Sequence, residues 1–321
     1  MAKFLVTGGA GFIGSHFCDA ALAKGHEVTV FDNFETGQEF FLQGAKKNEK
    51  FSLIRGDIRE FSEVNKAMSD FKPEWVVHFA ANADVRRGLE RPRRDLDYNT
   101  TGTWNVLESA QKAGAKNFLF SSTGSVYGEP TVFPTPESCP FPEQTSLYGA
   151  SKLAGEGLIA AYANGFAMNS LVFRFVSILG ARYTHGHIFD FMKRLKNDAS
   201  HLEILGNGKQ TKSYLHMTDL MSGLWMAIES QPKGHNVYNI GHDDALIVDQ
   251  SVGYICDALK IKPRLTYTGG TRGWVGDSPR IQLDCTKLKA LGWKTTQSLE
   301  QGVRDTVKYL EQQAFLFAEV K

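Results

Sequence analysis

The chain has 321 residues and a formal net charge of +1, with 42% hydrophobic and 22% charged residues. This composition is ordinary for a globular protein of one large domain or two closely joined ones. The balanced charge excludes a global field that would attract nucleic acid or an anionic membrane. No apolar stretch is long enough for a signal peptide or a membrane span, so we expect a cytoplasmic protein without a membrane partner.

Short apolar runs alternate with amphipathic segments over the first two-thirds of the chain. The runs that resemble buried strands are KFLVT (3–7), HEVTVFD (26–32), FSLIRGD (51–57), EWVVHFAA (74–81), KNFLFSS (116–122) and NSLVFRF (169–175). Segments with apolar residues at helical spacing lie between them. This alternation predicts an α/β fold, a Rossmann-like doubly wound parallel sheet with helices on both faces.

The alternation stops after Phe175, where a segment rich in glycine, histidine and lysine follows. Further strands are predicted within SYLHMTDL and NVYNIG, around a helix near 218–229, and a long helix is predicted within 298–315. We therefore expect a first domain of residues 1–175 plus about 214–242. A smaller mixed α/β lobe for the substrate would comprise about 176–213 plus 243–321.

A glycine-rich segment, GGAGFIG (8–14), joins the first predicted strand to a helical pattern. Glycines there let the backbone approach a pyrophosphate, and the helix N-terminus offers free N–H groups. A tight turn without a ligand is the alternative. Asp32 favours a dinucleotide, because it ends the second strand eighteen residues after Gly14, where a carboxylate would bind the adenosine ribose.

The residues around Asp32 favour NAD over NADP. A carboxylate at this position repels a 2′-phosphate, and the next residue is Asn33 rather than an arginine. Asp57 closes the third predicted strand. It either contacts the adenine or caps the following helix.

Tyr148 and Lys152 lie four residues apart, on one face of a predicted helix. A tyrosine hydroxyl titrates near ~10, and lowering that pKa by ~3 units requires ~4 kcal/mol. One ammonium about 4 Å away supplies about that much at an effective dielectric constant of ~20. The pair is thus a candidate base for a sugar hydroxyl; a solvated helix face is the alternative.

Thr123 lies in SSTGSVYG (121–128), directly after the fifth predicted strand. The carboxyl end of such a strand is where doubly wound sheets place their ligands. Thr123 would there hydrogen-bond the reacting oxygen, or else form a local cap or turn.

The motifs together resemble the extended short-chain dehydrogenase/reductase superfamily. TGGAGFIG, Asp32, HFAA (78–81), NTTGTWN (99–105), SSTGSVYG and YGASK occur in its order and spacing, and the likeness covers nearly the whole chain. Within the superfamily the chain is most similar to the nucleotide-sugar epimerases and dehydratases, the family of UDP-galactose 4-epimerase. The resemblance implies tightly bound NAD and hydride abstraction from a nucleotide-diphosphate sugar.

Carried over to this sequence, the resemblance makes Tyr148 the base and Thr123 the third catalytic residue, while Lys152 holds the nicotinamide ribose. Asn99 would support the active-site helix. The expected cofactor-binding residues are Gly8, Gly11, Phe12, Ile13, Gly14, Asp32, Asn33, Asp57, Ile58, Phe79, Ala80, Ala81, Asn99, Tyr148, Lys152 and Phe175.

The two residues after Thr123 argue against an elimination reaction. Related 4,6-dehydratases carry Asp-Glu there and UDP-glucuronate decarboxylases typically Ser-Glu, whereas this chain has Gly124 and Ser125, neither of which delivers a proton at neutral pH. We therefore expect a 4-epimerase that acts through a transient 4-keto sugar. The alternatives are a 4-oxidase or 4-keto reductase with net redox turnover, and a catalytically silent NAD-binding module.

The expected substrate contacts depart from the family pattern. Ser177 replaces a common asparagine, Lys212 a common arginine and Trp274 another arginine. A lysine still neutralises phosphate, but without the bidentate fork of arginine. We expect a sugar or nucleotide other than UDP-galactose. Arg272 or Arg280 would compensate for Trp274 in binding the diphosphate. The expected substrate-binding residues are Arg86, Thr123, Ser177, Lys212 and Arg280; for Arg86, Arg272 and Arg280 a charged surface is the alternative.

Cysteine and histidine spacing gives no metal or disulfide signal. Cys18, Cys139, Cys256 and Cys285 are widely separated and predict reduced thiols. YTHGH (183–187) has no further ligands at a familiar spacing, so we expect no metal. The resemblance also implies a homodimer, in which helices starting near Asp97 and Ser146 pair across a two-fold axis. That pairing would bury Trp104, Leu107, Leu153 and Leu158.

Overall fold

The computed structural model describes residues 1–84, 88–141, 143–273 and 280–317. The chain divides into two compact units. The first comprises residues 1–128, 140–175 and 224–239, and the second comprises residues 129–139, 176–223 and 240–321.

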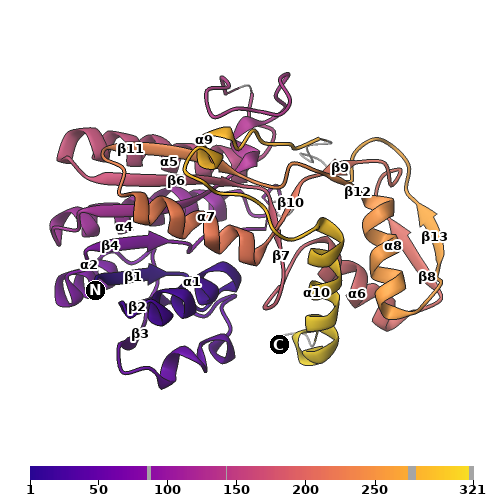
Figure 1. The fold of residues 1–321 in the computed structure, drawn as a ribbon, viewed down its shortest axis with the longest axis horizontal. Coiled ribbons are helices and arrows are strands. Elements are labelled where there is room, and N and C mark those ends of the chain that lie inside the picture. The colour runs from indigo at the N-terminus through magenta and orange to yellow at the C-terminus, as the bar shows by residue number, and fades with distance from the viewer. Residues whose placement is uncertain (85–87, 142, 274–279, 318–321) are drawn as a thin grey trace. The chain divides into compact units, whose positions relative to one another are not determined.

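A seven-stranded sheet forms the centre of the first unit (Figure 1). Its strands are β1 (Lys3–Thr7), β2 (Glu27–Asp32), β3 (Phe51–Arg55), β4 (Trp75–His78), β5 (Asn117–Thr123), β6 (Asn169–Phe175) and β11 (His235–Ile240), in the order β11-β6-β5-β4-β1-β2-β3. The pairs from β3 through β2, β1, β4 and β5 to β6 are parallel. The predicted Rossmann-like sheet is confirmed. Its order reverses between β1 and β4, so the carboxyl ends of these strands flank the crevice where such sheets bind ligands.

Helices cover both faces of this sheet. They are α1 (Phe12–Ala23), α2 (Phe61–Phe71), α3 (Pro92–Asp95), the π-helical η4 (Leu96–Gly102), α4 (Thr103–Lys112) and α5 (Leu147–Phe166), with the short 3-10 turns η1 (Glu39–Leu42), η2 (Ala45–Lys47) and η5 (Gly124–Tyr127). Leu5 of β1 packs in the core cluster with residues of α2, α4 and α5. The neighbouring Phe4 meets Phe17 of α1 and Trp225 instead. Successive strand residues thus bury opposite faces, as a doubly covered parallel sheet requires.

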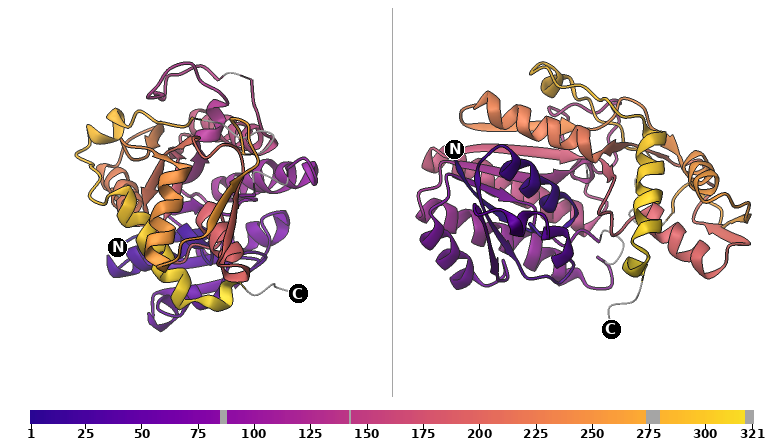
Figure 2. Two further views of the ribbon diagram at one scale, coloured as in Figure 1. Left: turned by 90° about the vertical axis from the view of Figure 1, so that its right-hand side faces the viewer. Right: turned by 60° about the horizontal axis from the view of Figure 1, so that its bottom comes forward.

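The second unit contains short strand pairs and a group of helices. Its strands are β7 (Ser177–Leu179), β8 (His201–Ile204), β9 (Thr211–Lys212), β10 (Tyr214–His216), β12 (Leu246–Ile247) and β13 (Arg264–Tyr267). β10 pairs with β7 and β13 with β8, both in parallel, while β12 pairs with β9 in antiparallel fashion. Its helices are α6 (His187–Asn197), α8 (Val248–Leu259), α9 (Thr286–Lys289), α10 (Leu299–Gln312) and η6 (Ala314–Phe317), and α7 (Met217–Ser230) begins in it. α10 packs against α8 and α6 (Figure 2).

The observed division differs from the expected one at two segments. Residues 129–139 belong to the second unit, because Thr135 exchanges backbone hydrogen bonds with Gln282 and Asp284. Residues 214–223 also belong there, since Asp219 accepts hydrogen bonds from the backbone of Thr296 and Gln297. Helix α7 therefore crosses a boundary that its regular pattern does not reveal. Within the described ranges, no helix is long and apolar enough to cross a bilayer.

Candidate active site

The glycine-rich turn between β1 and α1 lies against the end of β4. Gly8 has a φ of +69°, and a Cβ there would lie 2.5 Å from the Ala80 nitrogen. A Cβ on Gly14 would lie 2.2 Å from the Gly8 oxygen. Only glycine fits at these two positions. Helix α1 starts after Gly11 without a side-chain cap, which leaves its first N–H groups available to a pyrophosphate.

Asp32 ends β2 with its carboxylate fixed by backbone N–H groups. Oδ2 accepts from the Ala10 nitrogen at 2.9 Å and Oδ1 from the Phe34 nitrogen at 2.8 Å. Burial raises the pKa of Asp32, and these two hydrogen bonds oppose the shift. The carboxylate oxygens keep lone pairs for the hydroxyls of a ribose, so this end of the crevice fits an adenosine ribose.

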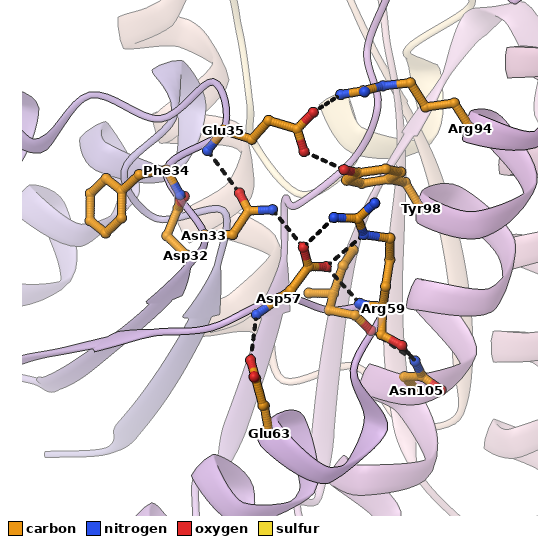
Figure 3. Close-up of polar contacts among 11 residues, drawn as sticks. Asp32, Asn33, Phe34, Glu35, Asp57, Arg59, Glu63, Arg94, Tyr98 and Asn105 are labelled. Atoms are coloured by element: carbon orange, nitrogen blue, oxygen red, sulfur yellow. Dashed lines mark hydrogen bonds and ion pairs between the residues drawn. The ribbon is translucent and has the colours of Figure 1, made fainter. Parts of the chain in front are cut away.

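Asp57 lies at the end of β3 within a set of polar contacts (Figure 3). It accepts from Asn33 Nδ2 at 2.9 Å and from Arg59 Nε at 3.0 Å. The Arg59 hydrogen bond is the main reason that the pKa of Asp57 falls to about 2. The expectation that Asp57 caps the next helix is wrong, because Glu60 holds the N-cap position of α2. Its other predicted role, at the adenine, stays a prediction.

Ile58 is held in place by the neighbouring helices. Asn105 of α4 donates its Nδ2 to the Ile58 carbonyl at 2.8 Å. A Cβ on Gly102 would lie 2.7 Å from Ile58 Cδ1, so the π-helical turn approaches Ile58 closely. The loop after β3 is thereby fixed beside the crevice.

Asn99 connects the segment after β4 to helix α5. Its Oδ1 accepts from the Asn82 nitrogen at 2.8 Å, and its Nδ2 donates to the Asn82 carbonyl at 3.0 Å and to Ser151 Oγ at 3.1 Å. Upstream, the nitrogens of Phe79 and Ala80 both donate to the Thr7 carbonyl. These contacts bring the ends of β1 and β4 and the start of α5 together.

Tyr148 and Lys152 share the first turns of α5, and burial shifts both of their pKa values. Ser146 caps the helix by accepting from the Gly149 nitrogen at 3.0 Å. Burial raises the pKa of Tyr148 to about 12, against a lowering hydrogen bond with Thr123. Burial lowers the pKa of Lys152 to about 7.

The expectation that Lys152 lowers the pKa of Tyr148 is not met in the chain by itself. The Lys152 Nζ donates to the Ser121 carbonyl at 2.8 Å and lies 4.6 Å from the centre of the Phe120 ring. The amine is therefore directed at the end of β5. A phenolate on Tyr148 needs positive charge from elsewhere.

Thr123 both forms a local turn and reaches the tyrosine. Its Oγ1 accepts from the Ser125 nitrogen at 3.1 Å, which caps η5, and donates to Ser125 Oγ at 3.2 Å. Thr123 also lowers the pKa of Tyr148. In the sheet it pairs with Phe175, the last residue of β6. The predicted local cap is confirmed, and the hydrogen bond from Thr123 to the reacting oxygen stays a prediction.

A buried ion pair that sequence reasoning missed lies one turn beyond Lys152. Arg174 of β6 donates Nε to Glu156 Oε1 at 3.0 Å and Nη2 to Oε2 at 2.7 Å, and its Nη1 donates to Tyr127 Oη at 2.7 Å. Glu156 also accepts from Ser122. The Glu156 charge opposes the lowering of the Lys152 pKa by burial.

The substrate residues expected in the second unit are partly brought together. Arg280 forms a backbone bridge with Thr211 of β9, and Lys212 is the next residue of that strand. The Arg280 guanidinium lies 4.2 Å from the centre of the Phe133 ring. Ser177 is exposed at the start of β7. Arg86 and Trp274 lie outside the described residues.

Arg272 and His187 of this unit both have partners within the chain. Arg272 forms an exposed ion pair with Glu129, and its role at the diphosphate stays a prediction. His187 is hydrogen-bonded to Ser251 Oγ at 2.7 Å, and burial lowers its pKa to about 3. In the described part of the chain, no three histidine, cysteine or acidic residues gather as metal ligands.

Comparison with known proteins agrees with this geometry. Residues 4–241 match the NAD dependent epimerase/dehydratase family. A UDP-glucose 4-epimerase of Corynebacterium glutamicum is 33% identical over 309 residues, covering 91% of this chain and 90% of that protein. The structure of UDP-glucose 4-epimerase from Thermotoga maritima with UDP-glucose is 32% identical, with a TM-score of 0.87 over 97% of this chain and 99% of that one. UDP-glucuronic acid 4-epimerase from Bacillus cereus, in complex with UDP-glucuronic acid and NAD, is 27% identical, with a TM-score of 0.88 over 97% and 99%. The chain therefore belongs to the NAD-dependent epimerase/dehydratase family, and its cofactor is NAD.

Proposed function

We propose that the chain is a nucleotide-sugar 4-epimerase that acts through a transient 4-keto sugar. The observation that carries the proposal is the close approach of the first turn of α5 to η5. A Cβ on Gly149, the residue after Tyr148, would lie 2.8 Å from the Ser125 oxygen, and Thr123 lowers the pKa of Tyr148. Thr123 is followed by Gly124 and Ser125. Neither of the two following residues supplies the acid that an elimination needs. The two solved relatives described above are named 4-epimerases, which supports C4 of the sugar as the reacting carbon.

The proposed chemistry assigns one proton transfer to Tyr148. Its Oη takes the proton of the sugar 4-hydroxyl as a hydride leaves C4, and returns it to the 4-keto oxygen when the hydride comes back to the opposite face. Thr123 hydrogen-bonds the same oxygen, and Lys152 holds the nicotinamide ribose. When bound, oxidised NAD supplies the hydride acceptor and a positive ring that favours the Tyr148 phenolate.

We assign the nucleotide diphosphate of the substrate to Lys212 and Arg280, with Ser177 and Arg86 as further contacts. The backbone of Arg280 bridges to Thr211, the residue before Lys212, which places the two basic residues in adjoining segments and supports this assignment. Cations suit the charges of a diphosphate. Relatives solved with UDP-glucose and UDP-glucuronic acid favour a UDP-sugar as the first substrate class to test.

The purified protein and its Tyr148→Phe variant should be incubated with UDP-, GDP-, CDP- and ADP-sugars. Proton NMR of the sugar ring and NADH absorbance are followed together. We expect a C4 epimer without lasting NADH, and loss of that product in the variant by roughly a hundredfold or more. NADH that rises in step with a keto sugar would replace the epimerase with a net oxidoreductase. An unchanged Tyr148→Phe variant would remove the tyrosine from the chemistry.

A further inference from the structure

Glu35 joins two segments of the first unit beside the cofactor site (Figure 3). It follows β2 and accepts hydrogen bonds from Arg94 of α3 and from the Tyr98 hydroxyl of η4. Partial burial opposes ionisation of Glu35, but the Tyr98 hydroxyl and then the Arg94 guanidinium outweigh it and lower its pKa. Glu35 is therefore a carboxylate at neutral pH.

Further contacts close a ring through the loop after β3. Asn33 accepts from the Glu35 nitrogen at 2.9 Å and donates to Asp57 at 2.9 Å. Asp57 in turn holds Arg59, whose guanidinium carbon lies 4.3 Å from the centre of the Tyr98 ring. Figure 3 shows these side chains converging from the three segments. Each of them restricts the position of the next.

The ring begins beside the group that fits the ribose. Asp32 Oδ1 accepts from the Phe34 nitrogen, and Phe34 directly precedes Glu35. In dinucleotide-binding folds an arginine near this carboxylate accommodates the 2′-phosphate of NADP. Arg94 reaches Glu35, three residues after Asp32 in the chain, and is held there in an ion pair.

We propose that Glu35 is a second determinant of NAD over NADP, in addition to Asp32, and that it acts by holding Arg94. Its negative charge repels a 2′-phosphate, and its ion pair removes the cation that would otherwise bind one. Tyr98 keeps Glu35 turned toward Arg94 through the second hydrogen bond. The inference concerns the NAD of the family and does not depend on the sugar.

Two other arginines lie near this end of the site. Arg59 is held by Asp57. The Arg55 guanidinium carbon lies 4.8 Å from the centre of the Phe34 ring, and its charge acts on Asp32. Arg55 is therefore the competing candidate for a 2′-phosphate, and a test must separate it from Arg94.

The test compares dissociation constants for NAD⁺ and NADP⁺ on cofactor-stripped protein by isothermal titration calorimetry. The variants are Glu35→Gln, Glu35→Gln/Arg94→Gln and Glu35→Gln/Arg55→Gln. Arg93→Gln is the matched control, because Arg93 is the next residue to Arg94 yet pairs with Asp97 on the exposed side of the helix.

We expect Glu35→Gln to improve NADP⁺ binding relative to NAD⁺ by about tenfold, the size of one charge-assisted hydrogen bond. Adding Arg94→Gln should abolish that gain, adding Arg55→Gln should leave it, and Arg93→Gln alone should change nothing. A gain that disappears with Arg55→Gln instead would assign the phosphate to Arg55 and overturn the proposal. So would a Glu35→Gln variant that keeps the wild-type ratio, or one that weakens both cofactors equally. Should Glu35→Gln fail to fold, Arg94→Gln alone gives the decision: NADP⁺ binding stronger than in the wild type contradicts the proposal, and no gain supports it.

Discussion

Tyr148 and Lys152 show that one cause shifts two neighbouring pKa values in opposite directions. Burial raises the pKa of the phenol to about 12 and lowers the pKa of the ammonium to about 7, because it favours the neutral form of each. Without a ligand, Tyr148 is therefore a proton donor at neutral pH. The base that we propose it to be therefore requires positive charge, which the bound cofactor would bring.

Asp95 is the buried carboxylate that acts on this tyrosine. Only 1% of it is exposed, and its charge raises the pKa of Tyr148. We expect Asp95→Asn to lower that pKa, so the rise of kcat with pH through the Tyr148 ionisation moves to lower pH. The pH profile of epimerisation measures the shift. Asp97→Asn, which removes a half-buried carboxylate two residues away that is paired with Arg93, should leave the profile in place. If the rise of kcat in Asp95→Asn stays at the same pH or moves to higher pH, the repulsion between Asp95 and the Tyr148 phenolate is contradicted.

Spacing along the chain revealed some site residues and concealed others. Asp32 and the Tyr148–Lys152 pair are recognisable because strand ends and helical turns repeat at fixed distances. Arg59 lies only two residues after Asp57, so the ion pair between them could have been predicted from the sequence. Glu35 and Arg94 are 59 residues apart and meet only through the fold, so no local pattern predicts their ion pair.

A buried ion pair joins two elements, β6 and helix α5. Arg174 and Glu156 are each almost fully enclosed and make several charge-assisted hydrogen bonds. Removing one partner leaves an uncompensated buried charge. The pair also fixes the helix turn that follows Lys152.

Arg174→Met should therefore lower the free energy of unfolding by about 3–5 kcal/mol. Urea denaturation monitored by circular dichroism measures the change. Arg304→Met, which breaks the exposed Glu300 pair on α10, is the control and should cost less than about 1 kcal/mol. Equal losses of unfolding free energy in the two variants would show that the buried pair stabilises the protein no more than the exposed one.

Two helical glycines should respond to alanine in opposite directions. A Cβ on Gly14 meets backbone at 2.2 Å, whereas a Cβ on Gly157 of α5 meets no atom within 4 Å. We expect Gly157→Ala to stabilise the protein by roughly 0.5–1 kcal/mol, the helix propensity difference. Gly14→Ala should destabilise it and abolish NAD binding, as thermal melting and calorimetry would show. A tolerated Gly14→Ala would mean that the turn does not need this close approach.

At the scale of the whole molecule, the alternation of strands and helices predicted the first unit well. Hydrophobic runs identified β1 to β6 because a strand buried on both faces is apolar along its length. The limits of the second unit were not predictable in the same way. Thr135 joins it through backbone hydrogen bonds to residues far along the chain, and backbone bonds carry no side-chain signature.

We expect the chain to form a homodimer through α4 and α5. Trp104 and Leu147 of these helices are each 40% exposed, which leaves apolar surface for a partner. Leu107 was wrongly expected in that interface, because it is fully buried in the core of the first unit. Light scattering at micromolar concentration should give twice the chain mass, and Trp104→Glu should give the chain mass. A wild-type monomer would contradict the dimer.

In the proposed reaction, the hydride removed from C4 returns to C4 of the same sugar. The direct measurement uses a substrate deuterated at C4, once a converting nucleotide sugar is found, and follows both epimers by NMR and mass spectrometry. We expect deuterium to stay at C4 in substrate and product, and a parallel reaction of unlabelled substrate in D₂O to introduce none there. Deuterium lost from C4, solvent deuterium gained at C4, or NADH that accumulates with a keto sugar would contradict it.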